Sequence, residues 1–179
     1  DLRLLRASSP RFGMRIVPVP PIVVGGQPIS SSRIRRLISQ GRFASVRRLL
    51  GRPAELYGTV VSGTGRGRRL GFPTANLHLA SEVLPPPGVY AVTVRTAQRG
   101  GDRPGVMNLG VRPTFGPGPL VCEVHLLGFT GTLRRHTVTV AILARLRRER
   151  CFPSPQALIR QVARDIRRAR RLFFRNYPQ

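Results

Sequence analysis

Residues 88–96, Gly-Val-Tyr-Ala-Val-Thr-Val-Arg-Thr, decide the fold, because they form a short run rich in β-branched and aromatic residues. Turn-rich stretches such as Leu-Pro-Pro-Pro at 84–87 lie between this run and others like it. Short strands at this spacing are typical of an antiparallel barrel or sandwich. We therefore expect a mainly β fold, a closed or partly closed antiparallel β-barrel with Greek-key-like connections. The predicted strands are Leu56–Ser62, Gly88–Thr96, Gly105–Gly110, Leu120–Leu127 and Thr137–Leu143.

Helical patterns flank these strands. Apolar residues at three- and four-residue spacing predict short helices over 31–39 and 43–50, with serines in front of the first and Gly51-Arg52-Pro53 after the second. Ser154-Pro155 opens a longer helix that runs to about Phe174. The proline-interrupted apolar run 14–24 predicts an edge strand or a strand-to-loop passage. A C-terminal helix and a short α/β segment in front should therefore accompany the barrel.

The charge of the chain is strongly positive. Thirty-one basic residues, all arginine, face seven acidic ones, which gives a formal net charge of +24. Such a field attracts polyanions, RNA included, whatever the fold. Arginine-rich coding bias is the other explanation, and the spread of arginines along the whole chain favours it.

Neither a membrane-spanning protein nor a zinc protein is expected. The longest apolar run is far shorter than the roughly 20 residues that cross a bilayer. The two cysteines, Cys122 and Cys151, and the three histidines lack metal-type spacing, so we expect no zinc site. Two unpaired thiols are typical of a reducing cytoplasm.

A glycine-arginine loop precedes the second candidate strand region. Glycines at 63, 65 and 67 let the backbone turn tightly and bring N–H groups close to an anion, with Arg66 and Arg68 beside them. The spacing matches neither the Walker loop nor the dinucleotide fingerprint. A plain hairpin turn is an equally good interpretation of the loop alone.

Pro73, Thr74 and Asn76 follow the loop. In an extended segment, residues two apart point the same way, so Thr74 and Asn76 would present a hydroxyl and an amide oxygen together. Neutral oxygens suit Mg²⁺ already carried by nucleotide phosphates. A local turn that satisfies backbone groups is the alternative.

Glu123 is a carboxylate in the middle of a predicted strand, in a chain with few acids. Alternation puts Val121, Glu123 and His125 on one strand face. Glu123 is either a solvated outward residue or a general base that accepts a hydroxyl proton during phosphoryl transfer.

Taken in order, these stretches resemble the riboflavin kinase family over about residues 55–172. The matching blocks are Gly63–Leu77, Pro87–Val92, Met107–Phe115, Glu123–Leu127 and Leu146–Phe152. The resemblance implies ATP and riboflavin as substrates, FMN as product and Mg²⁺ as the ion bound with ATP. It implies Glu123 as the base and Thr74 and Asn76 as ligands of the metal and phosphates.

The resemblance also implies two binding regions. The nucleotide would contact Gly63, Gly65, Arg66, Gly67, Arg68, Pro73, Thr74 and Asn76. The flavin side would comprise Asn108, Arg112, Pro113, Thr114, Phe115, Arg147 and Phe152.

The front of the chain resembles the end of the FMN adenylyltransferase (FAD synthetase) domain of bacterial bifunctional enzymes, at Ile29–Arg35 and Leu49–Pro53. We therefore divide the chain into 1–53, a remnant of that domain, and 54–179, a riboflavin kinase barrel with its C-terminal helix. The histidine motif of the adenylyltransferase half is not in this sequence, so FAD synthesis is not expected of it.

One stretch departs from the family. Where the family usually has Leu-Asp-Phe and then Asp-Leu-Tyr-Gly, this chain has Leu127-Gly128-Phe129 and then Thr132-Leu133-Arg134-Arg135. The lost carboxylate and aromatic bear on turnover and flavin affinity. Together with the charge, they leave open a weakened kinase-like domain that acts as an RNA- or ribosome-binding module.

Overall fold

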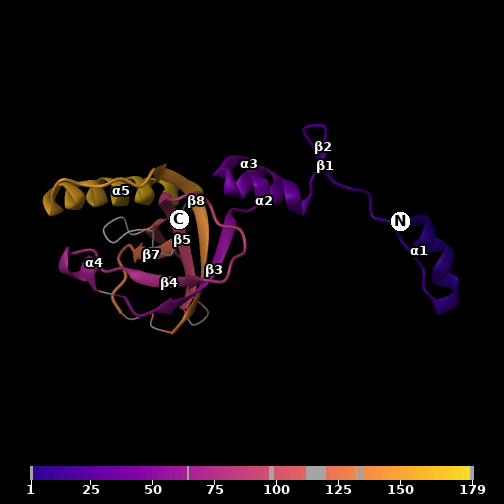
Figure 1. Ribbon diagram of the computed structural model, residues 1–179, viewed down its shortest axis with the longest axis horizontal. Helices are drawn as coiled ribbons and strands as arrows, with labels where there is room; N and C mark the ends of the chain where they lie inside the picture. Colours follow the sequence, from indigo (N-terminus) through magenta and orange to yellow (C-terminus); the bar gives the residue numbers. More distant parts are fainter. Residues whose placement is uncertain are drawn as a thin grey trace.

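The computed structural model describes residues 2–63, 65–96, 99–111, 120–131, 133 and 135–177. Its centre is a closed barrel of antiparallel strands, in the order β3-β4-β7-β6-β5-β8 (Figure 1). The mainly β prediction is therefore confirmed. The strands are β3 (Ala54–Val61), β4 (Ala75–Leu79), β5 (Gly88–Thr96), β6 (Arg99–Val111), β7 (Leu120–Leu126) and β8 (Thr137–Arg147).

Alternation along the strands fills the barrel. In β7, Cys122, Val124 and Leu126 are buried, whereas the residues between them are half-buried and point outward. Strand β5 is different, because nearly all of its residues are buried. Its inner side chains, among them Tyr90 and Val92, join the barrel core, and its outer side chains lie under a helix. Burial on both faces explains why this stretch is a continuous apolar run in the sequence.

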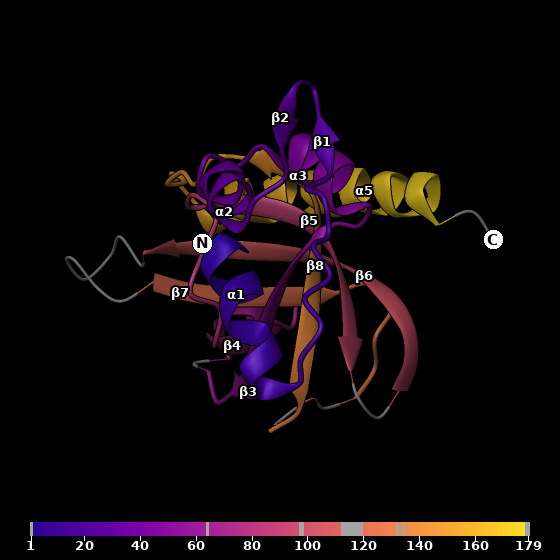
Figure 2. The same cartoon turned by 90° about the vertical axis from the view of Figure 1, so that its right-hand side faces the viewer.

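The covering helix is α5 (Pro155–Asn176), close to the predicted span. Ser154 caps it, since its Oγ accepts a hydrogen bond of 3.2 Å from the backbone N–H of Ala157. The helix lies across the outer face of the barrel (Figure 2). It encloses a second apolar cluster, formed by Val89, Ala91, Val106, Leu146 and Ala169.

Helices α2 (Ser31–Ser39) and α3 (Phe43–Leu50) have the predicted bounds. Ser30 caps α2 through a hydrogen bond of 3.2 Å to its Oγ from the N–H of Arg33. Phe43 packs edge-on against the Tyr90 ring, with centroids 5.7 Å apart. These helices therefore share the main core with the barrel, although the proposed boundary at 53/54 assigns them to the other part.

The N-terminal segment extends away from the barrel (Figure 1). It contains α1 (Leu2–Ser8), a 3-10 turn η1 (Ser9–Phe12) and a small hairpin of β1 (Val23–Val24) and β2 (Gln27–Pro28). Of the two alternatives for 14–24, a continuous edge strand is not observed: residues 14–22 have no regular structure and only Val23–Val24 pair, because Pro18, Pro20 and Pro21 cannot donate to a ladder. In the described part of the chain, no helix has the length and apolar character to span a membrane.

Several boundaries differ from the prediction. β6 begins at Arg99 rather than Gly105, so the stretch taken for a turn extends the β5–β6 hairpin.

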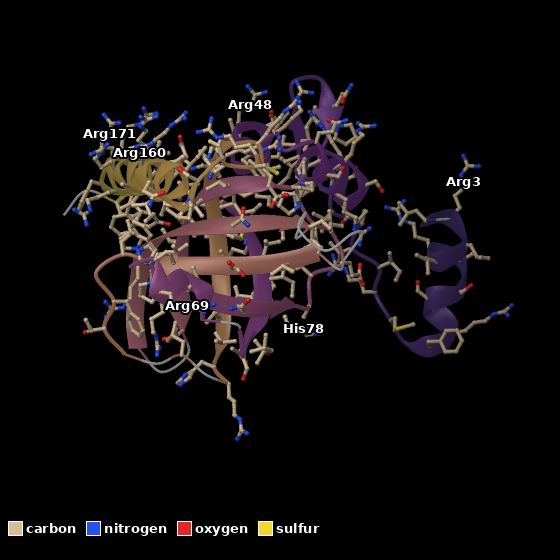
Figure 3. All side chains as sticks on the ribbon, turned by 60° about the vertical axis from the view of Figure 1, so that its left-hand side comes forward. Arg3, Arg48, Arg69, His78, Arg160 and Arg171 are labelled. Carbon is tan, nitrogen blue, oxygen red and sulfur yellow. The ribbon has the colours of Figure 1, made fainter. Side chains whose placement is uncertain are left out.

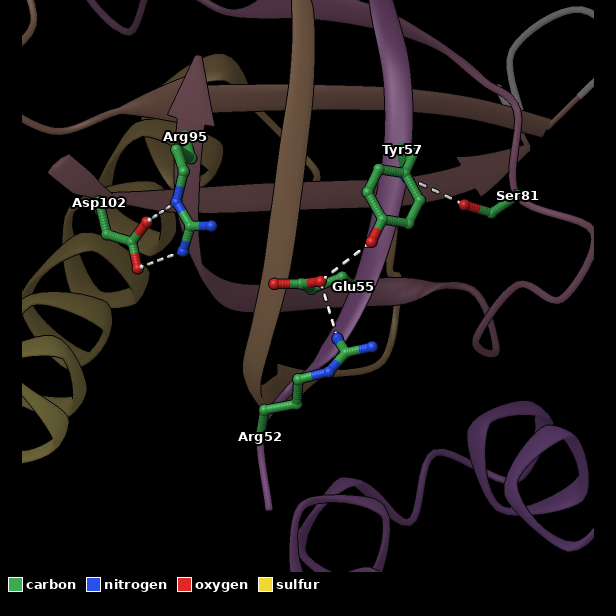
Figure 4. Close-up of polar contacts among 6 residues, drawn as sticks. All are labelled: Arg52, Glu55, Tyr57, Ser81, Arg95 and Asp102. Atoms are coloured by element: carbon green, nitrogen blue, oxygen red, sulfur yellow. Dashed lines mark hydrogen bonds and ion pairs between the residues drawn. The ribbon is translucent and has the colours of Figure 1, made fainter. Parts of the chain in front are cut away.

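An ion pair from Arg95 Nε to Asp102 Oδ1, 2.8 Å long, joins β5 and β6 near this hairpin (Figure 4). At the start of β3, Glu55 accepts hydrogen bonds from Tyr57 of the same strand and from Arg52, which precedes the strand. β4 was missed as a strand, and α4 (Arg66–Arg69) forms a single helical turn inside the glycine-arginine loop.

The two cysteines are free thiols in different environments. Cys122 is buried in the barrel, and Cys151 is exposed. Burial, with a smaller effect of the Glu123 charge, raises the pKa of Cys122 to about 12 from 9.0. Alkylation at pH 8 should therefore modify one thiol in the native protein and two after denaturation, counted by intact mass. Rapid alkylation of both thiols in the native protein would contradict the burial of Cys122.

The same thiol makes stability depend on pH. Between pH 9 and 12 the Cys122 thiol ionises in the unfolded chain but stays protonated in the folded one, so the stability from this group is lost as the pH rises through that window.

Candidate active site

A row of polar side chains crosses the outer face of the barrel. Cα pairing sets Asn76 of β4 opposite Glu123 of β7, and Glu123 opposite Asn108 of β6. The neighbours of Glu123 and Asn108 along their strands are buried, and Asn76 lies between the buried Leu77 and Ala75, which packs against the core, so all three point outward. Residues directly opposite have Cβ atoms about 4.5–5.5 Å apart. The half-buried Glu123 carboxylate therefore lies between two amides, on the same face as Asn76.

The row continues beyond Asn108. Val89 of β5 pairs with Asn108 on one side and with Arg147 of β8 on the other. At about 4.8 Å per strand, Arg147 lies roughly 14 Å from Glu123 across three strand spacings. α5 lies over Val89 in between. The barrel thus places residues that are far apart in the sequence in one row across its strands. Arg147 is at the end of this row and is not next to the Glu123 carboxylate.

Thr74 and Asn76 both approach the glycine-arginine loop. A Cβ atom at Gly67 would lie 2.9 Å from Thr74 Oγ1 and 2.5 Å from the Phe72 carbonyl oxygen. A Cβ at Gly63 would collide with the Asn76 amide. At Gly67 the collision is with backbone, so only glycine fits there, and at both positions the loop backbone comes directly against the hydroxyl or the amide. These neutral oxygens beside a glycine backbone fit a Mg²⁺ ion that is already carried by phosphates.

The loop borders a cavity of about 370 Å³ at one end of the barrel. Of the predicted nucleotide-binding residues, Gly63, Gly65, Arg68, Pro73, Thr74 and Asn76 line it. Gly67 lies in α4 next to the cavity, as does Arg66, whose side chain is outside the described part. Glu123 is not among the lining residues, so the candidate base lies beside the cavity rather than inside it, with Asn76 between them.

His125 was not predicted as a site residue, although alternation placed it on the Glu123 face. Its Nδ1 lies 2.8 Å from the Pro73 carbonyl oxygen, so Nδ1 carries the proton and donates it. Its ring also meets the Phe72 ring edge-on, with centroids 5.9 Å apart. His125 therefore ties β7 to the segment that carries Thr74.

Replacing His125 with Phe keeps a ring beside Phe72 but removes the donor to Pro73. For the reaction that the family resemblance implies, we expect the KM for ATP to rise about fivefold, since one hydrogen bond contributes roughly 1 kcal/mol, while kcat changes little. Steady-state kinetics with riboflavin saturating would measure the effect. His125→Gln, which retains an N–H donor, should recover part of the affinity. An unchanged KM for ATP together with a raised KM for riboflavin would refute this role.

The predicted flavin-side residues divide into three groups. Asn108 belongs to the polar row. Arg147 lies over the Phe152 ring, 5.4 Å from its centroid, and its Nε donates to the buried Asp165 over 2.9 Å. Arg112, Pro113, Thr114 and Phe115 lie outside the residues that the structure describes.

Glu149 is a further candidate that the sequence did not single out. Its carboxylate lies directly against Gly110, where a Cβ would collide with it. Gly110 pairs with Val121, one outward position along from the Asn108–Glu123 pair. A second carboxylate therefore lies beside the polar row. Its only signal in the sequence was its place in the Leu146–Phe152 block.

Taken together, the closed barrel, the glycine loop and the outward carboxylate suit a phosphotransferase. Comparison with known proteins is consistent with that class. The flavokinase family model, described as riboflavin kinase, matches residues 50–173. The bifunctional riboflavin kinase/FMN adenylyltransferase of Haemophilus influenzae is 36% identical over 173 residues, covering 97% of this chain and 56% of the relative. The chain therefore belongs to the riboflavin kinase family, and it spans about half the length of such curated relatives.

Solved structures resemble the chain as well. A Streptococcus pneumoniae crystal structure described as a macrolide-efflux protein aligns with a TM-score of 0.75 and 35% identity, covering 85% of this chain and 50% of that one. The riboflavin kinase of Trypanosoma brucei aligns with a TM-score of 0.51 and 28% identity, covering 72% of this chain and 80% of that one.

Proposed function

We propose that this chain transfers the γ-phosphoryl group of ATP to the ribityl 5′-hydroxyl of riboflavin, which yields FMN and ADP. Family membership supports the reaction class. The observation that carries the proposal is the pairing of Asn76 with Glu123, because it sets a carboxylate beside the loop that would hold the phosphates. A cytoplasmic location, where ATP is abundant, accords with this reaction.

Glu123 would orient the 5′-hydroxyl and accept its proton as the new P–O bond forms. The reacting oxygen would have to lie within about 3 Å of the carboxylate. Thr74 and Asn76 would hold the Mg²⁺–ATP complex, and the bound metal supplies charge neutralisation at the transferred phosphoryl group. The backbone N–H groups of the loop would add hydrogen bonds to the phosphate oxygens.

The flavin would lie along the polar row toward Arg147. Asn108 offers an amide next to Glu123, and Phe152 offers a ring already flanked by guanidinium groups. The resemblance to the family adds the segment Arg112–Phe115 to this side. Glu149 would supply a second acceptor for hydroxyl groups near the base.

The altered segment after β7 is compatible with the barrel. Gly128 has a φ of 66°, a conformation that glycine adopts without the strain of a side chain. Leu133 is buried in the main core. The carboxylate that the family usually has at position 128 is thus replaced by a residue suited to the local turn. The fit of Gly128 and Leu133 to the fold supports the proposal that the chain is active.

The division into 1–53 and 54–179 remains our proposal. Residues 1–53 would be the end of an adenylyltransferase domain, and FAD synthesis would need more of that domain than this sequence contains. The packing of Phe43 on Tyr90 gives α3 a second role as a support of the barrel end.

The test is formation of FMN from riboflavin, ATP and Mg²⁺, followed by reversed-phase chromatography with flavin fluorescence. A riboflavin analogue without the 5′-hydroxyl is the matched control and should give no phosphorylated product. Omission of the divalent ion should abolish transfer. If ATP is hydrolysed at the same rate with the analogue and no FMN forms from riboflavin, the proposal fails.

A second candidate function is a weakened kinase-like domain that binds nucleic acid. The arginines of α5 favour nucleic-acid binding as an additional property of the chain. Nucleic-acid binding would replace the kinase proposal only if the chain did not transfer phosphate to riboflavin.

A further inference from the structure

The exposed side of α5 carries a straight stripe of arginines. At about 100° per residue, six of them fall within an arc of roughly 100°, and over fifteen residues they extend about 22 Å along the helix. Figure 3 labels two of them, Arg160 and Arg171, on the outer side of the helix. The members, all exposed, are Arg160, Arg164, Arg167, Arg168, Arg171 and Arg175.

The helix itself contains one acidic residue to offset this α5 stripe. Between positions 150 and 179, Asp165 is the sole acid in the sequence. Asp165 is buried and already accepts hydrogen bonds from Arg147 and Gln161. Like charges at three- and four-residue spacing each destabilise a helix by about 0.2–0.5 kcal/mol. A bound polyanion would remove that repulsion along the whole stripe.

The stripe also borders a hollow. A cavity of about 470 Å³ lies between α5 and the end of β8. Besides Leu146, Gln161 and Asp165, its lining consists of Arg147, Arg150, Arg164, Arg167, Arg168 and Arg171. Among the described residues, none lines both this hollow and the cavity beside the glycine loop. Arg147 belongs both to this hollow and to the polar row, about 14 Å from Glu123 across three strand spacings, so the hollow adjoins the flavin side rather than the glycine loop.

We propose that the α5 stripe and its hollow bind the phosphate backbone of a single-stranded nucleic acid. A regular line of positive charge about 22 Å long matches a chain of several phosphates rather than one anion. A membrane surface fits poorly, because a membrane-bound helix turns its apolar face to lipid, whereas that face of α5 packs on the barrel. Guanidinium groups suit phosphate because they donate in a planar fork.

The net charge of the protein alone would also attract nucleic acid. The test must therefore separate the effect of where the arginines lie from the effect of the total charge. The stripe variant carries Arg164→Gln, Arg167→Gln, Arg168→Gln and Arg171→Gln. The matched control loses the same charge elsewhere, through Arg6→Gln, Arg11→Gln, Arg15→Gln and Arg35→Gln, which are all exposed. Circular dichroism melting should show that both variants remain folded.

Fluorescence anisotropy with a labelled 20-nucleotide uridine oligomer measures the affinity at several salt concentrations. We expect the stripe variant to bind at least tenfold more weakly and the control less than threefold. The slope of log K against log salt should fall by about 2–3 in the stripe variant, at about 0.7 per lost phosphate contact. Equal binding of a thymidine oligomer would identify backbone contacts, and preference for uridine a contribution of the 2′-hydroxyl.

Two results would overturn the proposal. Equal loss of affinity in both variants would show that only the total charge of the protein attracts nucleic acid. Binding of polyglutamate of the same length as tightly as the uridine oligomer would show that the stripe does not distinguish phosphates from carboxylates.

Discussion

Replacing Glu123 with Gln is expected to lower kcat for FMN formation about 100- to 10,000-fold, the usual contribution of a positioned general base. The amide keeps the size of the side chain and its place between Asn76 and Asn108. It cannot accept the hydroxyl proton. Rates should be measured under saturating ATP and riboflavin, so that binding does not limit them.

A matched control is available at Glu82, an exposed carboxylate in the turn after β4. Glu82→Gln removes the same charge and should leave kcat within twofold. Riboflavin binding to the Glu123→Gln protein, measured by quenching of flavin fluorescence, should stay within about threefold. Retention of more than a tenth of the wild-type kcat would rule Glu123 out as the base.

Replacing Asp165 with Ala is expected to lower the free energy of unfolding by about 3–5 kcal/mol, the usual cost of leaving one partner of a buried ion pair alone. The side chain of Asp165 is 6% exposed and that of its partner Arg147 is 19% exposed. Gln161 would lose its 2.8 Å hydrogen bond to the carboxylate as well. Urea denaturation followed by circular dichroism gives the free energy.

The ion pair between Arg95 and Asp102 provides the contrast. Its side chains are 56% and 15% exposed. Asp102→Ala should therefore cost no more than about 1 kcal/mol, as is usual for surface pairs. If both substitutions have similar effects on the free energy of unfolding, the Arg147–Asp165 pair does not behave as a buried ion pair. In the Asp165→Ala protein, Arg147→Ala should cost little further, because the two residues act as one unit.

Local sequence patterns specified most of the elements. Apolar spacing located α2, α3 and α5, and capping serines marked the starts of α2 and α5, because each pattern is contained within its own segment. The hairpin extension of β6 was missed, since its glycines and Pro104 are typical of a turn. Ladder hydrogen bonds to β5 and the Arg95–Asp102 pair outweigh that local preference. In the run before residue 25, prolines outweighed apolar character.

The candidate site could be assembled only once the pairing register of the barrel strands was known. Alternation along β7 put Glu123 and His125 on one face, but nothing in the sequence shows that Asn76 is opposite Glu123. The contact between His125 and Pro73, fifty-two positions apart, is equally invisible before the strands close. Glu149 was overlooked for the same reason, because its carboxylate meets Gly110 only after the chain crosses the barrel end.

The strand that closes the barrel arrives late in the chain. β8 pairs with β3 through Ala54 and Ile142, and with β5 along its length. During synthesis, the hydrogen-bonding edge of β3 must therefore wait for almost ninety further residues before it gains this neighbour. Such distant pairing slows folding and prolongs the exposure of an unpaired edge to other nascent chains.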